Sequence, residues 1–194
     1  MIVGTEDDPT TVAEAVLVGG GRVLQYRGKN KGGATQLREA RCLREMTRAF
    51  GATLVINDRP DIALLSDADG VHLGATDLPI FVVRRMLGPD KVIGATAHSL
   101  DEAVTAEAEG ADYIGFGAVF PTRSKQNATV RNPGMLGKIA RRVAIPVLGI
   151  GGINRHNAGQ VMGQGALGVA VLSAVTASED PAAATGEILT ALAV

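Results

Sequence analysis

The stretch Gly149-Ile150-Gly151-Gly152-Ile153, followed by Val169-Ala170-Val171-Leu172-Ser173-Ala174, decides the fold class. Each stretch closes a short apolar run that is typical of a buried parallel strand, and a helical pattern lies between the two runs. In (β/α)8 barrels, the loops after the seventh and eighth strands commonly bind phosphate through backbone N–H groups and the start of a short helix. The pair therefore indicates a barrel with a phosphate pocket in these two loops.

The rest of the chain repeats the same alternation of strand and helix. We expect strands at Ile2-Val3, Val23–Tyr26, Thr53–Ile56, Gly70–Leu73, Val92–Ala95, Tyr113–Phe116, Pro146–Gly149 and Gly168–Leu172. We expect helices at Thr10–Val18, Thr35–Phe50, Pro60–Leu65, Leu78–Leu87, Leu100–Glu109, Pro133–Arg142, Asn157–Met162 and Pro181–Leu192. Eight units in 194 residues leave about 24 residues each, which predicts a compact α/β TIM barrel with short loops that fills one domain, residues 1–194. An open doubly wound sheet is the competing architecture.

Composition excludes several classes of function. The chain has 19 basic and 20 acidic residues, a net charge of -1 and 3% aromatic residues without Trp, which argues against a nucleic-acid surface. No apolar run approaches the ~20 residues of a membrane span, and the first residues lack the pattern of a signal peptide, so we expect a cytoplasmic protein without membrane contact. The single cysteine, Cys42, excludes an internal disulfide and is expected to be buried in a helix. Composition does not reveal the oligomeric state, and a homo-oligomer is possible.

Polar residues collect where the second strand ends. Period-2 alternation places Gln25, Arg27 and Lys29 on one side of that strand, with Tyr26 and Gly28 on the other. Two cationic side chains on one side of the strand can bind a phosphate group. The alternative interpretation is a basic loop in solvent.

The ends of the next two strands each carry an aspartate. Asp58 follows the third strand and Asp77 follows the fourth, and adjacent strands of a barrel bring such ends together. Two carboxylates suit Mg²⁺, which keeps several waters and completes its shell with substrate phosphates. In the alternative interpretation, both aspartates are N-caps of the helices that begin near Pro60 and Pro79.

Two further strand ends supply hydroxyls and a histidine. Thr96 could meet a ring nitrogen or an amine of a substrate, and His98 is either an acid or base or a structural hydrogen-bonding group. After the sixth strand, Thr122, Ser124 and Lys125 offer hydroxyl donors and an ammonium to phosphate oxygens. We expect Lys125 to belong with Arg27 and Lys29, apart from the phosphate pocket of the last two loops.

Taken together, these motifs resemble the thiamine phosphate synthase family. The motifs that carry the resemblance are Gln25-x-Arg27-x-Lys29, Ile56-Asn57-Asp58, Asp69-Gly70-Val71-His72-Leu73-Gly74-x-x-Asp77, Gly110-Ala111-Asp112-Tyr113, Pro121-Thr122-x-Ser124-Lys125, Gly149-Ile150-Gly151-Gly152-Ile153 and Leu172-Ser173. The resemblance runs from about Val23 to Val175. It implies an enzyme that joins hydroxymethylpyrimidine diphosphate to hydroxyethylthiazole phosphate and releases pyrophosphate.

The resemblance also implies roles for individual residues. The pyrimidine would contact Gln25 and Thr96, and Mg²⁺ would be held by Asp58 and Asp77. The diphosphate would be held by Arg27, Lys29, Asn57, Thr122, Ser124 and Lys125, of which the catalytic cations are Arg27, Lys29 and Lys125. The thiazole phosphate would be received by Gly152, Leu172 and Ser173. No nucleophilic residue is needed, because departure of diphosphate requires stabilised negative charge rather than a strong base.

Some positions depart from the family pattern. Gly28 stands where an acidic residue is common, Ala75 where glutamine is usual and Thr96 where serine is frequent, and the first strand lacks the usual Ile-Thr-Asp ending. A thiazole tautomerase of the same barrel family, which would use a histidine such as His98 and no metal, remains an alternative. A non-catalytic binder of thiamine precursors is a third.

Overall fold

The computed structural model describes residues 1–4, 8–122, 124 and 129–193. The strands in this part of the chain are β1 (Ile2–Val3), β2 (Val23–Tyr26), β3 (Thr53–Asn57), β4 (Gly70–Leu73), β5 (Val92–Ala97), β6 (Tyr113–Gly117), β7 (Val147–Ile150) and β8 (Gly168–Ala170). They pair in parallel and in sequence order, from β1 to β8. The N–H of Ile2 donates to the carbonyl of Val171, 2.9 Å away, which joins the two outer strands. The sheet is therefore a nearly closed barrel, as expected, and the open-sheet alternative is wrong.

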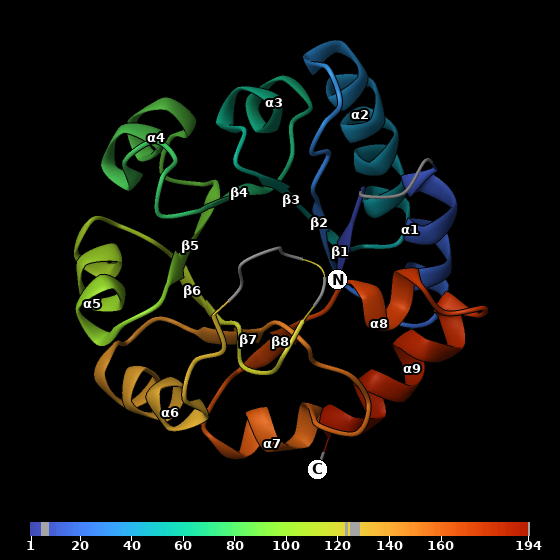
Figure 1. Cartoon of the computed structure of the whole chain (residues 1–194). Coiled ribbons are helices and arrows are strands. Elements are labelled where there is room, and N and C mark those ends of the chain that lie inside the picture. The colour runs from blue at the N-terminus through green and yellow to red at the C-terminus, as the bar shows by residue number, and fades with distance from the viewer. Residues whose placement is uncertain (5–7, 123, 125–128, 194) are drawn as a thin grey trace.

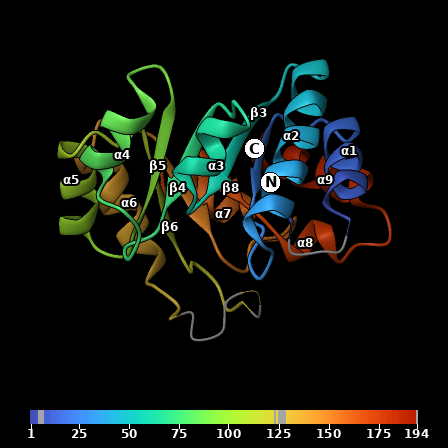
Figure 2. The same ribbon diagram turned by 90° about the horizontal axis from the view of Figure 1, so that it is seen from above.

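Helices surround this barrel (Figure 1). They are α1 (Pro9–Val18), α2 (Gly33–Ala49), α3 (Pro60–Leu65), α4 (Ile80–Leu87), α5 (Leu100–Ala108), α6 (Pro133–Arg142), α7 (Ala158–Gly163), α8 (Ser173–Thr176) and α9 (Pro181–Leu192). The four-residue α8 was not expected as a separate element, because the predicted eighth strand ran on to Leu172. Seen from the side, α8 lies at the same end of the barrel as the chain that leaves β6 (Figure 2). None of the helices in the described residues has the length and apolar character needed to cross a membrane.

Local signals explain most of the helix ends. The hydroxyl of Ser99 accepts from the N–H of Glu102 and caps α5. Four glycines that follow helix ends have the left-handed backbone that glycine adopts without cost: Gly51 (φ 62°), Gly88 (φ 84°), Gly110 (φ 97°) and Gly165 (φ 94°). α2 begins at Gly33, two residues before the expected start at Thr35, with Gly32 as its N-cap.

The core fills the barrel and the layer between sheet and helices. Leu24, Leu54, Val71, Ile93 and Ile114 are fully buried on the successive strands β2 to β6. Cys42 is exposed, so its expected burial is wrong. Its helix turns Ala40, Leu43 and Thr47 to the core, and this spacing leaves position 42 on the flank of the buried stripe.

Two aspartates hold the opposite end of the barrel together. A carboxylate oxygen of Asp112, just before β6, accepts from the N–H of Ile93 at 2.7 Å. Asp69, just before β4, accepts in the same way from the N–H of Leu54 at 2.7 Å. These bonds tie each strand start to its neighbour but lie away from the strand ends that carry the candidate site. The base therefore stabilises the barrel and the other end is free for chemistry.

Candidate active site

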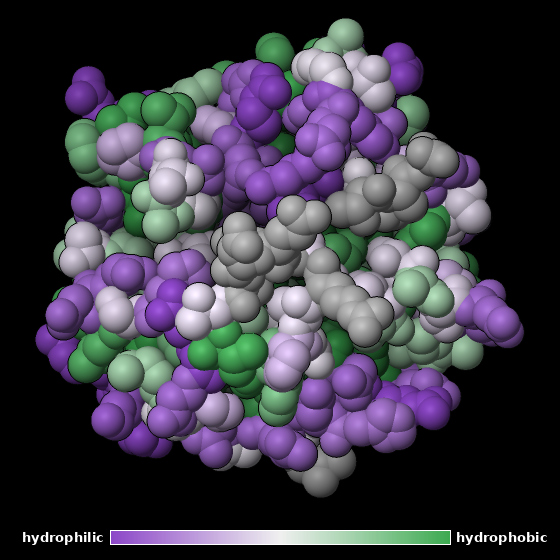
Figure 3. Space-filling model, viewed as in Figure 1, coloured by the Kyte–Doolittle hydropathy of each residue, from purple (hydrophilic) through white to green (hydrophobic). Residues whose placement is uncertain are grey.

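A cavity of about 490 Å³ opens at the carboxyl ends of the strands. Among its lining residues are all the predicted site residues that the structure describes: Gln25, Arg27, Lys29, Asn57, Asp58, Asp77, Thr96, Thr122, Ser124, Gly152, Leu172 and Ser173. Lys125 lies outside the described residues. Hydrophilic residues gather over α2 and α3 on the face of the molecule that carries these strand ends (Figure 3). Residues far apart in the sequence thus meet in one cavity.

The end of β2 supplies the cations. Gln25, Arg27 and Lys29 line the cavity, whereas Tyr26 points away from it and donates a 2.6 Å hydrogen bond from its hydroxyl to Glu39 on α2. The predicted alternation is confirmed. Gly28 has no room for a side chain, because a Cβ there would lie 2.4 Å from the Tyr26 hydroxyl oxygen. A side chain at position 28 would therefore require the Tyr26 hydroxyl to move.

Asp58 and Asp77 form the acidic part of the site. Neither is an N-cap, because Arg59 precedes α3 and Pro79 precedes α4 at those positions. Asp77 instead accepts from the N–H of Gly74 at 2.7 Å, and Asp58 lies 3.8 Å from the ammonium of Lys29. The capping interpretation of both residues is therefore wrong.

The two carboxylates lie close enough to influence each other's charge. Burial, followed by a hydrogen bond to Asp77 and the negative charge of Asp77, raises the pKa of Asp58 to about 6, while Lys29 and Arg27 act in the opposite direction. No group of three or more His, Cys, Asp or Glu side chains with the spacing of a metal site occurs in the described residues. Two mutually repelling carboxylates beside an open cavity fit the small ligand set of Mg²⁺.

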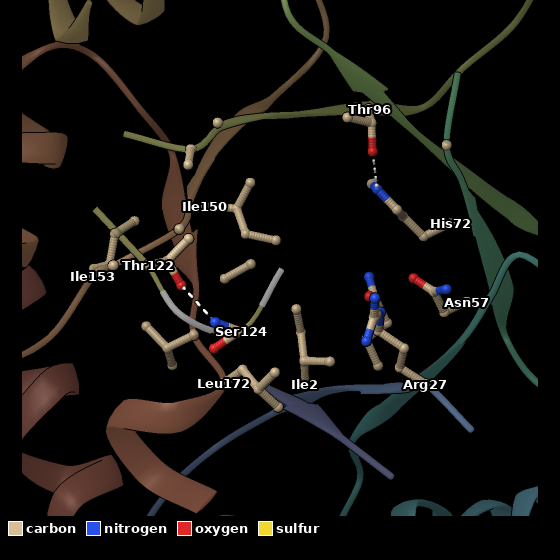
Figure 4. A pocket seen from close by; sticks show the side chains of 18 of the residues that line it. Ile2, Arg27, Asn57, His72, Thr96, Thr122, Ser124, Ile150, Ile153 and Leu172 are labelled. Carbon is tan, nitrogen blue, oxygen red and sulfur yellow. Dashed lines mark hydrogen bonds between the residues drawn. The ribbon is translucent and has the colours of Figure 1, made fainter. Parts of the chain in front are cut away.

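A buried network beneath the cations includes two residues that sequence reasoning did not select. His72 lies 2.9 Å from the Tyr113 hydroxyl through Nδ1 and 2.9 Å from the Thr96 hydroxyl through Nε2 (Figure 4). Tyr113 also hydrogen-bonds Gln25, so the chain of contacts joins the two predicted pyrimidine contacts. Gly94 leaves the space that the Tyr113 ring occupies, since a Cβ at position 94 would lie 2.0 Å from that ring.

Burial keeps this network uncharged. Burial lowers the pKa of His72 to about 4 and raises the pKa of Tyr113 well above its usual value. At neutral pH, His72 is therefore a neutral imidazole that donates through one nitrogen and accepts through the other. A signal was available in the sequence, because His72 stands on β4, the strand that Asp77 follows.

His98 lies at the rim of the same cavity. Its Nδ1 is 2.9 Å from the carbonyl oxygen of Gly117, and its backbone N–H donates to the Glu102 carboxylate at 2.7 Å. A carbonyl can only accept, so Nδ1 carries the proton. The ring is held in one orientation, as a structural hydrogen-bonding group would be, which is one of the two roles considered from the sequence.

The opposite wall carries hydroxyl groups. The hydroxyl oxygens of Ser124 and Ser173 lie 3.3 Å apart, and Thr122 accepts from the N–H of Ser124 at 3.2 Å. Thr122, Ser124 and Leu172 lie across the cavity from Arg27 and Asn57 (Figure 4). The two separate pockets expected from the sequence are thus two walls of one cavity, and Ser124 lies at the wall of Ser173.

Arg131 is a further cavity residue that the sequence analysis did not select. It stands in the loop that precedes α6, and its backbone N–H donates to the carbonyl of Ala118 at 2.7 Å. A lone arginine in a Gly/Pro-containing loop carries no sequence signal of its own. Only the return of the loop to the end of β6 brings it to the site.

The fold and the cavity define a TIM-barrel enzyme whose polar residues meet at the carboxyl ends of the strands. The thiamine monophosphate synthase (TMP-TENI) family model matches residues 1–175, and the chain belongs to that family. The thiamine-phosphate synthase of Chlorobium luteolum is 44% identical over 97% of this chain and 90% of the relative. That of Pyrococcus furiosus is 46% identical over 92% of this chain and 85% of the relative.

A solved structure agrees with these relatives. Thiamine phosphate pyrophosphorylase from Pyrococcus furiosus superposes with a TM-score of 0.91 at 41% identity, over 96% of this chain and 90% of the other. The predicted family, the barrel and the assignment to the transferases of thiamine biosynthesis are confirmed. Both of these relatives carry the synthase name, which favours the synthase over the tautomerase and the non-catalytic binder.

Proposed function

We propose that this chain performs the synthase reaction of its family in the cavity described above, with its two substrates held by opposite walls. One substrate is hydroxymethylpyrimidine diphosphate and the other is hydroxyethylthiazole phosphate. The observation that supports this arrangement is the division of the cavity into a wall of cations and carboxylates and a facing wall of hydroxyls.

The charged wall suits the diphosphate. Arg27, Lys29 and Asn57 would bind its oxygens. Lys125 would bind them as well, a role that only the sequence supports. Asp58 and Asp77 would hold Mg²⁺, since their mutual repulsion is relieved by a cation. When bound, the ion would supply positive charge that stabilises the departing pyrophosphate.

The neutral network suits the pyrimidine. Gln25 and Thr96 are fixed at the two ends of the chain of contacts through Tyr113 and His72. Both have polar groups that can meet the ring nitrogens and the amino group of an aminopyrimidine. His72 and Tyr113 would act through these two residues, as positioning groups.

The hydroxyl wall suits the thiazole phosphate. Gly152, Leu172 and Ser173 would receive this phosphate, and the contact between Ser124 and Ser173 supports placing Thr122 and Ser124 with them. This differs from the sequence expectation, which placed Thr122 and Ser124 at the diphosphate. Both assignments stay predictions, and substrate-specific Michaelis constants of Ser124→Ala distinguish them.

The chemistry requires no base from the protein. The bond between the pyrimidine methylene carbon and the diphosphate oxygen breaks, and its electron pair leaves with pyrophosphate. Arg27 and Lys29 balance the negative charge that develops, and the aminopyrimidine carries the positive charge until the thiazole nitrogen attacks the methylene carbon. No proton is transferred in this step, so His98 does not act as an acid or a base in it.

The experiment is pyrophosphate release by the purified protein with both substrates, with and without Mg²⁺. We expect turnover that excess chelator abolishes and Mg²⁺ restores, because two carboxylates are too few ligands for tight binding. Full turnover in excess chelator would contradict the metal role of Asp58 and Asp77. Absence of pyrophosphate release under all conditions would contradict the proposed reaction.

Two statements about the whole protein also stay proposals. The substrates are small molecules, and we propose that the enzyme works in the cytoplasm, with neither nucleic acid nor membrane as a partner. A homo-oligomer is compatible with the structure, and size-exclusion chromatography with light scattering measures the oligomeric state.

A further inference from the structure

Arg131 places an unsatisfied donor at the cavity. Its side chain is half-buried and lines the cavity, and its Nε is buried without a hydrogen-bond partner. Buried donors of folded proteins are nearly always paired, and an unpaired charged donor is costly. A group that enters the cavity can supply the missing acceptor.

The charges around the cavity show what that group must be. The cationic side chains of Lys and Arg that line it within the described residues are Arg27, Lys29 and Arg131. The charges that act on the Asp58 carboxyl are those of Asp77, Lys29 and Arg27, so the carboxylates of the cavity are balanced by the end of β2. Arg131 forms no ion pair with any carboxylate of the described residues. Within the described residues Arg131 therefore has no anionic partner, and an anion that enters the cavity can supply one.

The position of the loop indicates which anion this is. The backbone of Arg131 is bound to Ala118, and a Cβ at Gly151 would lie 2.6 Å from the Ala118 Cβ, so Arg131 starts beside the β7 loop. That loop contains Gly152 and belongs to the hydroxyl wall. Hydroxyls and backbone N–H groups there can bind a phosphate but supply no charge to balance it.

We propose that Arg131 is a substrate-binding residue that recognises the phosphate of the thiazole substrate. Its guanidinium pairs with the phosphate oxygens, while Ser124 and Ser173 provide neutral hydrogen bonds. Arg131 thereby makes the enzyme select the phosphorylated thiazole over the free alcohol. This inference rests on the proposed function and adds a specificity-determining residue to it.

The test compares two ligands and two variants. Binding of hydroxyethylthiazole phosphate and of the unphosphorylated alcohol is measured by calorimetry on the parent protein, on Arg131→Gln and on Arg131→Lys. Arg142→Gln, an exposed arginine in the last turn of α6, is the matched control. Michaelis constants for both substrates are measured on the same preparations.

We expect Arg131→Gln to weaken binding of the phosphate ester by ~10-fold or more, the range of a charge-assisted hydrogen bond. Binding of the alcohol and the Michaelis constant for the pyrimidine diphosphate should stay at the parent values. The melting temperature should not fall, because the unpaired donor does not stabilise the unliganded protein. Arg131→Lys should recover part of the loss, because it keeps the charge but not the planar fork. Arg142→Gln should behave as the parent.

Three results would overturn the inference: unchanged binding of the phosphate ester by Arg131→Gln, an equal loss for ester and alcohol, or a loss confined to the pyrimidine diphosphate. Failure of the proposed function gives a different pattern, because the parent itself would then release no pyrophosphate. In that case binding of inorganic phosphate still tests Arg131. A parent and an Arg131→Gln variant that bind inorganic phosphate equally would reject it as an anion site.

Discussion

Glu39 on α2 ties down the cationic segment at the end of β2, and its removal should weaken both the fold and one substrate site. Its carboxylate accepts from the Tyr26 hydroxyl at 2.6 Å and from the Lys31 ammonium at 2.9 Å. Tyr26 and Lys31 lie on either side of Arg27 and Lys29 along the chain. The carboxylate therefore holds both ends of the segment that carries the two cations.

The magnitude follows from burial. The side chains of Lys31 and Glu39 are 20% and 15% exposed, so the pair is largely but not fully shielded from water. Breaking a fully buried pair from one side costs about 3–5 kcal/mol. Glu39→Gln keeps the size of the side chain and one oxygen that can accept from Tyr26. We therefore expect the smaller loss that is typical of a charge-assisted hydrogen bond, about 2 kcal/mol of the free energy of unfolding. For a domain of this size, that lowers the melting temperature by about 4–8 °C.

The effect on catalysis should be selective. Because Arg27 and Lys29 lie between the two contacts of Glu39, Glu39→Gln should raise the Michaelis constant for the pyrimidine diphosphate several-fold. The constant for the thiazole phosphate, which lies at the other wall, should not change. The assay is pyrophosphate release with one substrate varied at a time, together with thermal denaturation.

Glu45→Gln is the matched control, because Glu45 is an exposed glutamate on the same helix. Tyr26→Phe removes only the hydroxyl contact and should give a smaller loss of stability. The reasoning is refuted if Glu39→Gln melts at the temperature of Glu45→Gln and leaves the Michaelis constant for the pyrimidine diphosphate unchanged.

The remaining predictions concern pH, the neutral network and the base of the barrel. Because the pKa of Asp58 is raised to about 6, Mg²⁺ affinity should fall ~10-fold from pH 7 to pH 5 as the carboxyl is protonated, and metal titrations that do not vary with pH would contradict this. Because the pKa of Asp58 is raised in the folded state, Asp58 stabilises the fold most below its unfolded pKa, and this stabilisation is lost as the pH rises through about 6. Denaturation midpoints of the parent and of Asp58→Asn, measured at pH 4 and pH 7, would detect the difference. His72→Phe should raise the Michaelis constant for the pyrimidine by loosening Thr96, with no change of the pH profile between pH 5.5 and 8, because the pKa of His72 is about 4; a shifted profile would show that His72 titrates in catalysis. Asp112→Ala should lower the free energy of unfolding, measured by denaturant titration, by about 1–3 kcal/mol, because the Ile93 N–H is left without an acceptor. A variant that keeps full stability but loses turnover would show that Asp112 acts in catalysis instead.

The sequence predicted the barrel because each unit repeats the same local physics. Buried parallel strands appear as short apolar runs, and glycines with positive φ mark several of the helix ends. Strand ends were less predictable, since β5 continues to Ala97 through residues that look like a loop. α8 was missed because four residues are too few to show helical periodicity.

The candidate site was predictable where function follows directly after a strand. Arg27, Asp58 and Asp77 were placed correctly at one cavity because the ends of parallel strands in a barrel converge. The contribution of Tyr113 depends on a partner 41 positions earlier in the chain and on the space left by Gly94, and Glu39 acts from a helix. Such contacts depend on register and packing between elements, which no local pattern encodes.

Charged and neutral side chains of the site lie at different depths, and this difference favours one orientation of the substrate. The side chains of Lys29 and Asp58 are 51% and 30% exposed, whereas His72 is 8% exposed and neutral. Ions are held near the rim because burying them costs more than their pairing returns, and neutral hydrogen-bonding groups can lie deeper. In the proposed binding mode, a pyrimidine diphosphate that matches this gradient enters ring first, with its diphosphate at the rim. The bond that breaks then points from the neutral floor to the charged rim, so pyrophosphate can depart toward solvent while the ring stays held for attack by the thiazole.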